Sequence, residues 1–435
     1  MSLGGRRTQN IMAALGSPQS SVTSSVRRHR PDYMIILYMG LLMLFGLIII
    51  YAIGPQRANV LNNSYGSDYG DSYFFIKQAT SLLFSLVAFG VMAALPYAWM
   101  NKQSNKLLIV GFLACTLLAV AGWLGLSIAQ CSLGACRWFD FGVWGSLQPA
   151  EILKFSIMVF LAGFLGMRVS QDKINSVQDT LIPLSVIAGL ALLFIVVIQK
   201  DLGTGVALMG IIITMLMVSG INKKVGATIV ALGFLVGIGF IFMAPHRVDR
   251  ITTFLKGDNS SVSDEGGYHI EHAKIAIGAG GLWGVGIGNS IQATGYLPEA
   301  INDSVFAIMG ETFGFIGLVA VLILFTALLM RLLKVMDHLV DIRLKLIAAG
   351  TFGWLGSHVI LNIASMIGIF PLTGITLPLM SFGGTSMIFI AAALGLVFQL
   401  SRYTTRSSRL KEAAYEDSSS RRGIRRSRYA SRGSF

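Results

Sequence analysis

Carboxylate side chains that border or enter long apolar stretches are the residues of this sequence best suited to chemistry. Asp303 stands where a polar stretch meets an apolar run, and Glu311 follows it about two helical turns later on much the same face. Asp303 could simply cap a helix. Glu311 lies among apolar residues, where an ionised group is costly, so it needs a partner or a water-filled cavity. Both residues, with Glu299 shortly before them, are candidates for a functional site.

Cationic side chains at other edges of apolar runs could bind an anion. Glu151 and Lys154 share one helix face because they are three residues apart, and they form either a site or a local ion pair at a helix start. Arg137 precedes them. Arg247 and Arg250 flank the end of a later apolar run, where two guanidinium groups can grip a diphosphate in a fork geometry that lysine lacks. Ordinary surface charge is the alternative for these arginines.

Two other patterns could suggest a metal or a nucleotide. His269 and His272 flank Glu271, but no third firm ligand accompanies them, so a metal site is the less favoured interpretation. The glycine cluster at residues 278–288 has neither a preceding strand nor a following Lys-Ser/Thr pair, which excludes a phosphate-binding loop. We expect close backbone packing or a re-entrant turn there.

The composition indicates that lipid is the solvent for most of this chain. Of 435 residues, 54% are hydrophobic and 13% are charged, whereas soluble domains carry roughly 25% charged residues. We therefore expect an all-α polytopic membrane protein with about ten transmembrane helices. The predicted spans are residues 33–53, 75–95, 107–128, 150–167, 180–198, 202–219, 225–244, 304–330, 344–370 and 385–401.

The distribution of charge predicts the orientation. With the N-terminus inside, the inner segments hold 25 of the 34 lysines and arginines, and the outer segments hold 13 of the 21 carboxylates. This is the positive-inside pattern, and it explains the net charge of +13 better than a nucleic-acid partner does. Both termini are predicted to be cytoplasmic, and the candidate residues above then all lie on the outer side.

Three parts are predicted along the chain. Residues 1–32 form a basic cytoplasmic segment, and residues 33–401 form the ten-helix membrane domain, with a long outer loop at 245–303 between the seventh and eighth helices. The first span is expected to stay as an anchor, since no small-residue cleavage site follows it. Residues 402–435 are rich in Ser and Arg and are predicted to be a disordered tail. The tail is either a topology anchor that also touches anionic lipid or a docking segment.

Two outer segments carry structural expectations. Cys131 and Cys136 lie in one short loop that should face an oxidising compartment, so we predict a disulfide between them. Two free thiols are the alternative, because so short a ring could fail to reach good geometry. Residues 370–386 contain two prolines and three glycines, which preclude a regular helix and predict a re-entrant segment. Asn362, in the preceding span, could hydrogen-bond this segment or serve simple helix packing.

Taken in order, these motifs resemble the SEDS family of FtsW and RodA. The similarity extends over nearly the whole hydrophobic part of the chain. The sequence motifs at residues 288–300 resemble those of FtsW more than those of RodA. The matching segments are Arg137-Trp, Gln148-Pro-Ala-Glu-x-x-Lys154, Asp201-Leu-Gly-Thr204, Gly288-Asn-Ser, Tyr296-Leu-Pro-Glu-Ala300, Asp303, Gly310-Glu311, Gly314-Phe-Ile-Gly317, Pro371-x-Thr-Gly374, Leu377-Pro and Ser381-Phe-Gly-Gly384.

The resemblance implies an inverting peptidoglycan glycosyltransferase that acts in cell division at the outer face of the bacterial cytoplasmic membrane. It would transfer the growing glycan from undecaprenyl diphosphate to a sugar hydroxyl of lipid II. Asp303 would be the general base. The other site residues implied are Arg137, Lys154, Arg247 and Arg250 as diphosphate contacts, Glu151 as the residue that orients Lys154, and Glu299 and Glu311 as further substrate contacts. No cofactor is certain, although a divalent cation could assist.

The resemblance also implies partners and leaves rival functions open. The expected partners are a class B penicillin-binding protein and other divisome proteins, in addition to the membrane. The rivals are a lipid II flippase, which should carry polar residues at the midplane or on both faces, and a division scaffold with weakened activity. The sequence departs from the usual family pattern at His269, Ile301, Asn302, Ser304 and Thr312. Those departures keep the scaffold hypothesis open.

Overall fold

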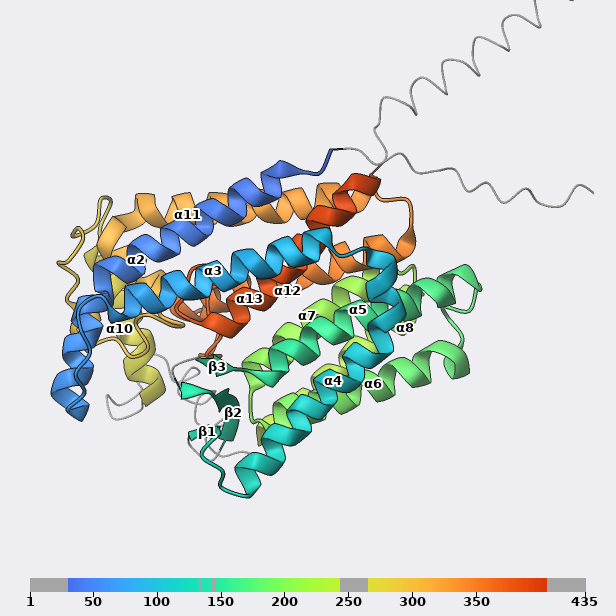
Figure 1. The fold of residues 1–435 in the computed structure, drawn as a ribbon, viewed down its shortest axis with the longest axis horizontal. Helices are drawn as coiled ribbons and strands as arrows, with labels where there is room; N and C mark the ends of the chain where they lie inside the picture. Colours follow the sequence, from blue (N-terminus) through green and yellow to red (C-terminus); the bar gives the residue numbers. More distant parts are fainter. Residues whose placement is uncertain (1–29, 133–134, 143–144, 243–264, 405–435) are drawn as a thin grey trace, which may run out of the picture.

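Ten long helices form the membrane domain in the computed structural model, which describes residues 30–132, 135–142, 145–242 and 265–404. Eight described helices are long and apolar enough to cross a bilayer, and one of them is α6 (Ile182–Leu192) with its π-helical extensions η2 (Val177–Leu181) and η3 (Leu193–Ile198). α7 and α8 complete the ten (Figure 1), so the predicted polytopic fold is confirmed. The other membrane helices are α2 (Tyr33–Tyr65), α3 (Tyr73–Ala94), α4 (Tyr97–Trp123), α5 (Pro149–Ser170), α7 (Leu202–Val218), α8 (Lys223–Phe242), α11 (Val305–His338), α12 (Ile342–Met366) and α13 (Gly384–Leu400).

Several helices are longer than the apolar runs that predicted them. α2 continues for twelve residues past the predicted end at residue 53, and Gly66 then closes it in the left-handed conformation at φ +63°. α4 begins at Tyr97 instead of residue 107, and α11 continues to His338 instead of residue 330. A hydropathy window measures the apolar run only, whereas a helix can continue into water, where its polar side chains are solvated.

The two described ends of the chain meet at one end of the bundle, here called the terminal end. The backbone N–H of Asp32 donates to Ser401 Oγ at 2.8 Å, and the Asp32 carboxylate pairs with Arg331 on α11. Leu339, in the α11–α12 connection, forms an isolated β-bridge with Thr404. An even number of spans requires this arrangement, because only then do both termini leave on the same side.

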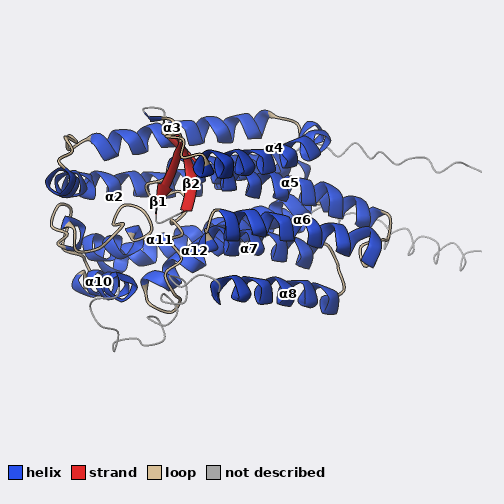
Figure 2. Cartoon of the chain, turned by 90° about the horizontal axis from the view of Figure 1, so that it is seen from below, coloured by secondary structure: helices blue, strands red, loops and turns tan. Residues whose placement is uncertain are grey.

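The opposite end, here called the sheet end, carries the elements that lie between the helices. They are β1 (Ala129–Ser132), β2 (Ala135–Asp140) and β3 (Ser146–Leu147), together with α10 (Glu265–Ala279) and the 3-10 turn η5 (Gln292–Thr294). Figure 1 shows the strands and α10 at the same end of the bundle. In Figure 2 α8 lies at the edge of the bundle, beside α7.

The strands correct the expectation of a plain polar loop between α4 and α5. β1 pairs antiparallel with β2, and β2 pairs with β3. Cys131 lies opposite Cys136 in this register, and the structure joins them in a disulfide. Gly122 at the end of α4 packs against the disulfide, since a Cβ there would lie 2.5 Å from Cys136 Sγ. Two cross-strand cysteines bring their Cβ atoms close enough to bond, a geometry that sequence spacing alone does not reveal.

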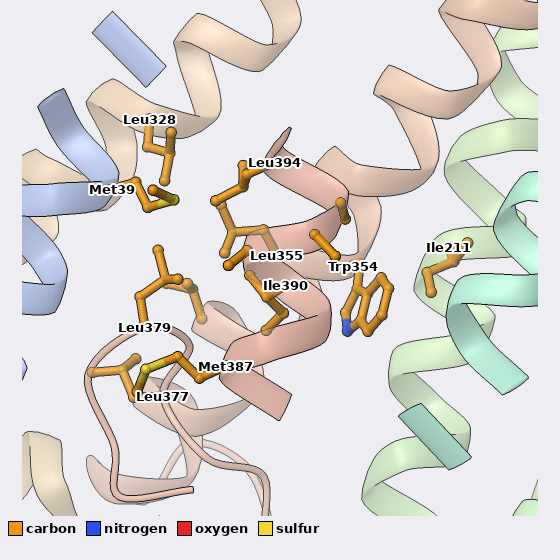
Figure 3. Packing of buried hydrophobic residues seen from close by; sticks show 14 of the residues in the cluster. Met39, Ile211, Leu328, Trp354, Leu355, Leu377, Leu379, Met387, Ile390 and Leu394 are labelled. Atoms are coloured by element: carbon orange, nitrogen blue, oxygen red, sulfur yellow. The ribbon is translucent and has the colours of Figure 1, made fainter. Parts of the chain in front are cut away.

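α12 and α13 are the most buried of the helices that can cross a bilayer, and they form the centre of the bundle. Figure 3 shows Leu355 of α12 among Ile390 and Leu394 of α13, while Trp354 points toward Ile211 of α7. Glycines allow close helix approach, as is usual in membranes. A Cβ at Gly395 of α13 would lie 2.4 Å from the Phe89 carbonyl oxygen of α3.

A break in α11 explains the glycine cluster at residues 278–288. Gly314 leaves the helical conformation at φ +67° and ψ −167°, which frees two carbonyls before it and two N–H groups after it. Val285 and Gly286 donate to the Glu311 and Thr312 carbonyls at 2.9 and 3.1 Å. The freed N–H groups of Phe315 and Ile316 donate to the carbonyls of residues 281 and 282. The expected close backbone packing is confirmed, and the predicted span at residues 304–330 is present with a break at Gly314 that the sequence did not predict.

We expect Gly314→Ala to lower the stability of the protein by about 2 to 5 kcal/mol. A Cβ at this position would lie 2.4 Å from the Gly284 nitrogen and 2.5 Å from the Leu282 oxygen, and the positive φ disfavours alanine. Thermal melting of the purified protein measures the change. Gly278→Ala is the matched control, because its Cβ would have no atom within 4 Å and alanine favours the helix. Equal melting temperatures for the two variants would contradict the packing argument.

Candidate active site

A buried ion pair lies at the start of α5, at the sheet end. Lys154 Nζ and Glu151 Oε1 are 2.8 Å apart, and the two side chains are 0% and 2% exposed. α5 begins at Pro149, so Glu151 lies in the first turn near the positive end of the helix dipole. The ammonium also lies 4.9 Å from the centre of the Trp354 ring, in a cation–π contact. The pairing predicted from the three-residue spacing is present, and it is buried.

His358 of α12 completes the surroundings of Lys154. Its Nε2 lies 3.3 Å from Lys154 Nζ, and its Nδ1 lies 3.4 Å from the Thr376 carbonyl oxygen. An ammonium can only donate, so Nε2 accepts and the proton of the neutral ring is on Nδ1, directed at Thr376. Glu151 and His358 together take two of the three N–H groups of Lys154. The third N–H has no hydrogen-bond acceptor among the described residues, and the Trp354 ring lies beside the ammonium.

Other polar atoms around the ion pair also lack partners in the described part of the chain. They include Glu151 Oε2 and Trp354 Nε1, both on residues less than 3% exposed. Buried polar atoms are normally hydrogen-bonded. Their concentration beside Lys154 indicates a place for water or for polar groups of a substrate.

Asn362 links this cluster to Asp303. Its Nδ2 donates to the Asp303 carbonyl and to the Ile375 carbonyl, each at 2.7 Å, and the residue is fully buried. His358 and Asn362 are four residues apart on α12, so they lie one above the other on the same face, about 5 to 6 Å apart. Because His358 contacts Lys154 and Asn362 contacts the Asp303 backbone, this face of α12 fixes the separation of Lys154 and Asp303.

The segment after α12 is held by the same contacts. Residues 370–383 are not helical, and several of their backbone groups are hydrogen-bonded to protein, as expected of a re-entrant segment. Ile375 accepts from Asn362, the N–H of Leu377 donates to Ser381 Oγ at 2.8 Å, and that of Phe382 donates to the Ile301 carbonyl at 2.8 Å. The expected hydrogen bond from Asn362 is confirmed.

Asp303 is buried, at 8% exposed, at the start of α11. The N-cap of α11 is Ser304 and not Asp303, so the capping interpretation is wrong. Its backbone is held on both sides, because Asn362 binds its carbonyl and the N–H of Ser304 donates to the Glu299 carbonyl at 3.2 Å. A rigidly held, buried carboxylate can serve as a general base.

Arg137, for which the sequence predicted a diphosphate contact, binds two backbone carbonyls. Its Nη2 donates to the Lys200 carbonyl at 2.8 Å and its Nε to the Gln199 carbonyl at 3.3 Å, which ties β2 to the turn between η3 and α7. In the same turn, Asp201 caps α7 through the N–H of Thr204 and accepts from Gln148 Nε2 at 3.0 Å. These contacts favour a positioning role for Arg137.

Glu311 and Glu299 also hold the structure around Asp303. Glu311 is 2% exposed and accepts from the N–H groups of Ile291 and Gln292 and from the hydroxyl of Ser290. Glu299 is exposed, has a φ of +49°, and pairs through its carboxylate with Asn302. Both contact sets favour structural roles over the substrate contact predicted, with Glu311 anchoring the loop that precedes the Asp303 segment.

The remaining candidates are the arginines and the histidine pair. Arg247 and Arg250 lie outside the described residues. Within the described part of the chain, no three His, Cys, Asp or Glu residues lie close enough to hold a metal ion. His269 Nε2 lies 2.6 Å from Ser304 Oγ, and His272 Nδ1 lies 2.8 Å from Gln292 Oε1. The two histidines therefore serve different neighbours.

The sequence prediction missed Trp354 and His358. A signal for them exists, because Trp354, His358 and Asn362 recur every four residues within an apolar span and so share one face. Polar groups aligned on one face of a membrane helix point to a buried site.

This chain is similar in sequence to known proteins over most of its length. Residues 32–406 match the model of the cell cycle protein family of FtsW, RodA and SpoVE. The chain is 32% identical over 384 residues to stage V sporulation protein E of Bacillus subtilis, covering 87% of this chain and 99% of that protein. It is 30% identical over 375 residues to the probable peptidoglycan glycosyltransferase FtsW of Nitrosomonas europaea, covering 85% and 93%.

A solved structure has the same fold. The study of that structure concerns the coordination of polymerisation and crosslinking by a peptidoglycan synthase complex. One of its chains superposes with a TM-score of 0.66 at 24% identity, covering 87% of this chain and 99% of that chain.

Proposed function

This chain belongs to the FtsW, RodA and SpoVE family and is a peptidoglycan glycosyltransferase, and we propose that it polymerises lipid II with Asp303 as the general base. The observation that carries the proposal is the buried face of α12, which holds Lys154 through His358 and Asp303 through Asn362. A cation of α5 and a base that precedes α11 are thereby held by neighbouring turns of α12.

The proposed reaction needs those two groups. Asp303 removes the proton from the attacking sugar hydroxyl of lipid II as the oxygen bonds to the anomeric carbon of the growing glycan. The bond from that carbon to the undecaprenyl diphosphate breaks, and its electron pair leaves with the diphosphate, inverting the configuration. The third N–H of Lys154 stabilises the departing charge in a site shielded from water. Arg247 and Arg250, on the same predicted loop, are proposed to assist.

The proposed orientation places the sheet end outside and both termini in the cytoplasm. The distribution of basic residues supports it, since Arg331, Lys334, Arg343 and Lys345 border the α11–α12 connection at the terminal end. The active site then faces the side on which cell wall is built.

Tags at both termini and in the segment from Arg331 to Lys345 are expected to resist membrane-impermeant reagents in intact cells, whereas the Pro245 to Asp303 loop should be labelled. The reason is that short basic connections stay on the cytoplasmic side. Labelling is compared before and after permeabilisation, which must expose every tag. Labelling of the tail in intact cells would overturn the orientation.

We also propose a penicillin-binding protein as partner and lipid II as substrate. Support comes from the related chain found in a peptidoglycan synthase complex and from the relative named as a glycosyltransferase. A role in division is proposed because the motifs at residues 288–300 resemble those of FtsW. Sporulation is the competing role, since a sporulation protein is among the similar relatives.

Polymerisation of lipid II by the purified protein, with and without a class B penicillin-binding protein, tests the proposal. Glycan chains longer than the lipid II disaccharide are the expected product. Movement of lipid II across a liposome membrane without glycan formation would favour the flippase instead. The grouping of Glu151, Lys154 and Asp303 at the sheet end favours the polymerase, because a transporter places its polar site near the midplane.

A further inference from the structure

We propose that His269 is a positioning residue for Asp303 and acts through the hydroxyl of Ser304. The inference rests on the proposed role of Asp303 as the base. His269 belongs to α10, outside the membrane helices, and only 9% of it is exposed. Its Nε2 lies 2.6 Å from the Oγ of Ser304, which follows Asp303 directly and is fully buried.

The direction of this hydrogen bond follows from counting protons. The Ser304 hydroxyl donates to the Pro298 carbonyl at 2.8 Å. A hydroxyl has one proton, so Ser304 Oγ must be the acceptor toward His269, and Nε2 carries the donated proton. The neutral ring with the proton on Nε2 and the doubly protonated ring both satisfy this requirement. His269 is therefore a donor in every protonation state compatible with the geometry.

α10 is packed firmly against the protein, so the hydrogen bond from His269 can fix the position of Ser304. Ala273 and Ala276, on the face that packs inward, are fully buried. Beyond the helix, a Cβ at Gly280 would lie 1.9 Å from the Gly310 carbonyl oxygen, so the backbones of the α10 end and α11 are in direct contact. A helix fixed in this way cannot slide without breaking its contacts.

The bond completes the support of the Asp303 backbone. Asn362 holds the Asp303 carbonyl from α12. Ser304 is held by its N–H to Glu299, by its hydroxyl to Pro298, and by the ring of His269 from α10. Catalytic groups must be kept within about 0.5 Å of the productive geometry. Loss of the donor removes one of the three contacts that hold Ser304, so the carboxylate of the preceding Asp303 can shift.

The test compares His269→Ala with His269→Gln, whose amide N–H can still donate to Ser304. We expect His269→Ala to lower the kcat of lipid II polymerisation about tenfold, with KM changed less than about twofold, because misplacement of the base acts on the chemical step. His269→Gln should retain kcat within about threefold of wild type. Glu271→Gln, an exposed residue on the same helix, is the matched control and should be unchanged. Rates are normalised to folded protein by thermal melting.

A double-mutant cycle with Ser304→Ala separates positioning from general stability. If the bond transmits the effect, His269→Ala adds less than about twofold to the loss caused by Ser304→Ala. Full additivity, or a His269→Ala protein that polymerises at the wild-type rate, would overturn the inference. Asp303→Asn is assayed in parallel. An active Asp303→Asn protein would disprove the proposed role of Asp303 as the base. An inactive Asp303→Asn protein together with a fully active His269→Ala protein would disprove only the role of His269.

Discussion

Replacing Asp303 by asparagine is expected to lower the rate of glycan polymerisation by roughly 100- to 10,000-fold, the usual contribution of a general base. The amide has nearly the same volume as the carboxylate but cannot take the proton from the attacking hydroxyl. The hydrogen bonds to the Asp303 backbone carbonyl and to the Ser304 hydroxyl do not involve the carboxylate, so they survive the change. The fold and the melting temperature should therefore stay close to wild type.

The measurement is glycan-chain formation from lipid II by purified variants matched for membrane yield and thermal melting. Glu311→Gln is the companion variant, because its carboxylate anchors Ile291 and Gln292 and should cost stability before it costs rate. An Asp303→Asn protein that polymerises near the wild-type rate would remove Asp303 from the mechanism and favour the flippase or the scaffold.

Lys154→Met is expected to abolish measurable polymerisation and to destabilise the protein. Loss of the cation that faces the diphosphate should lower the rate by at least about 100-fold. It also leaves Glu151 buried at 2% exposure without its partner, and breaking a buried ion pair typically costs about 3 to 5 kcal/mol. Both losses are measured on the same preparation, by lipid II polymerisation and by thermal melting.

The double variant Glu151→Gln with Lys154→Met distinguishes the two losses. Replacing both members of a buried pair by neutral residues of similar size is often close to neutral for stability. We therefore expect the melting temperature to recover while polymerisation stays absent. Recovery of activity in the double variant would mean that the ion pair is structural and that Lys154 has no contact with the substrate.

The membrane architecture could be predicted from the sequence because lipid constrains it so strongly. Every backbone polar group in a bilayer must be satisfied within the protein, so each long apolar run must be a helix. Glu151 and Lys154 could be recognised as a pair because a spacing of three places them on one helix face whatever the surrounding fold.

The rest depended on contacts between distant segments. The backbone groups freed by the break at Gly314 are hydrogen-bonded by residues 281–286, which lie in a separate segment before α11. The sequence of α11 alone does not reveal these contacts. The β-hairpin around Cys131 and Cys136 depends on strand register. The contacts of Arg137 with the carbonyls of residues 199 and 200 could not be predicted for the same reason, because only the fold shows which carbonyls lie near the guanidinium.

The packing of α3 along α13 affects how the protein is made. Gln399 of α13 donates to the carbonyl of Leu95, at the end of α3 and 304 residues away in sequence, so the bundle cannot close before the last span has been synthesised. Contacts between such distant parts of a chain form late. A nascent chain that ends before α12 already contains Lys154 and Asp303, but it lacks His358 and Asn362, which hold them. The contacts that position Lys154 and Asp303 are therefore incomplete until α12 has been inserted.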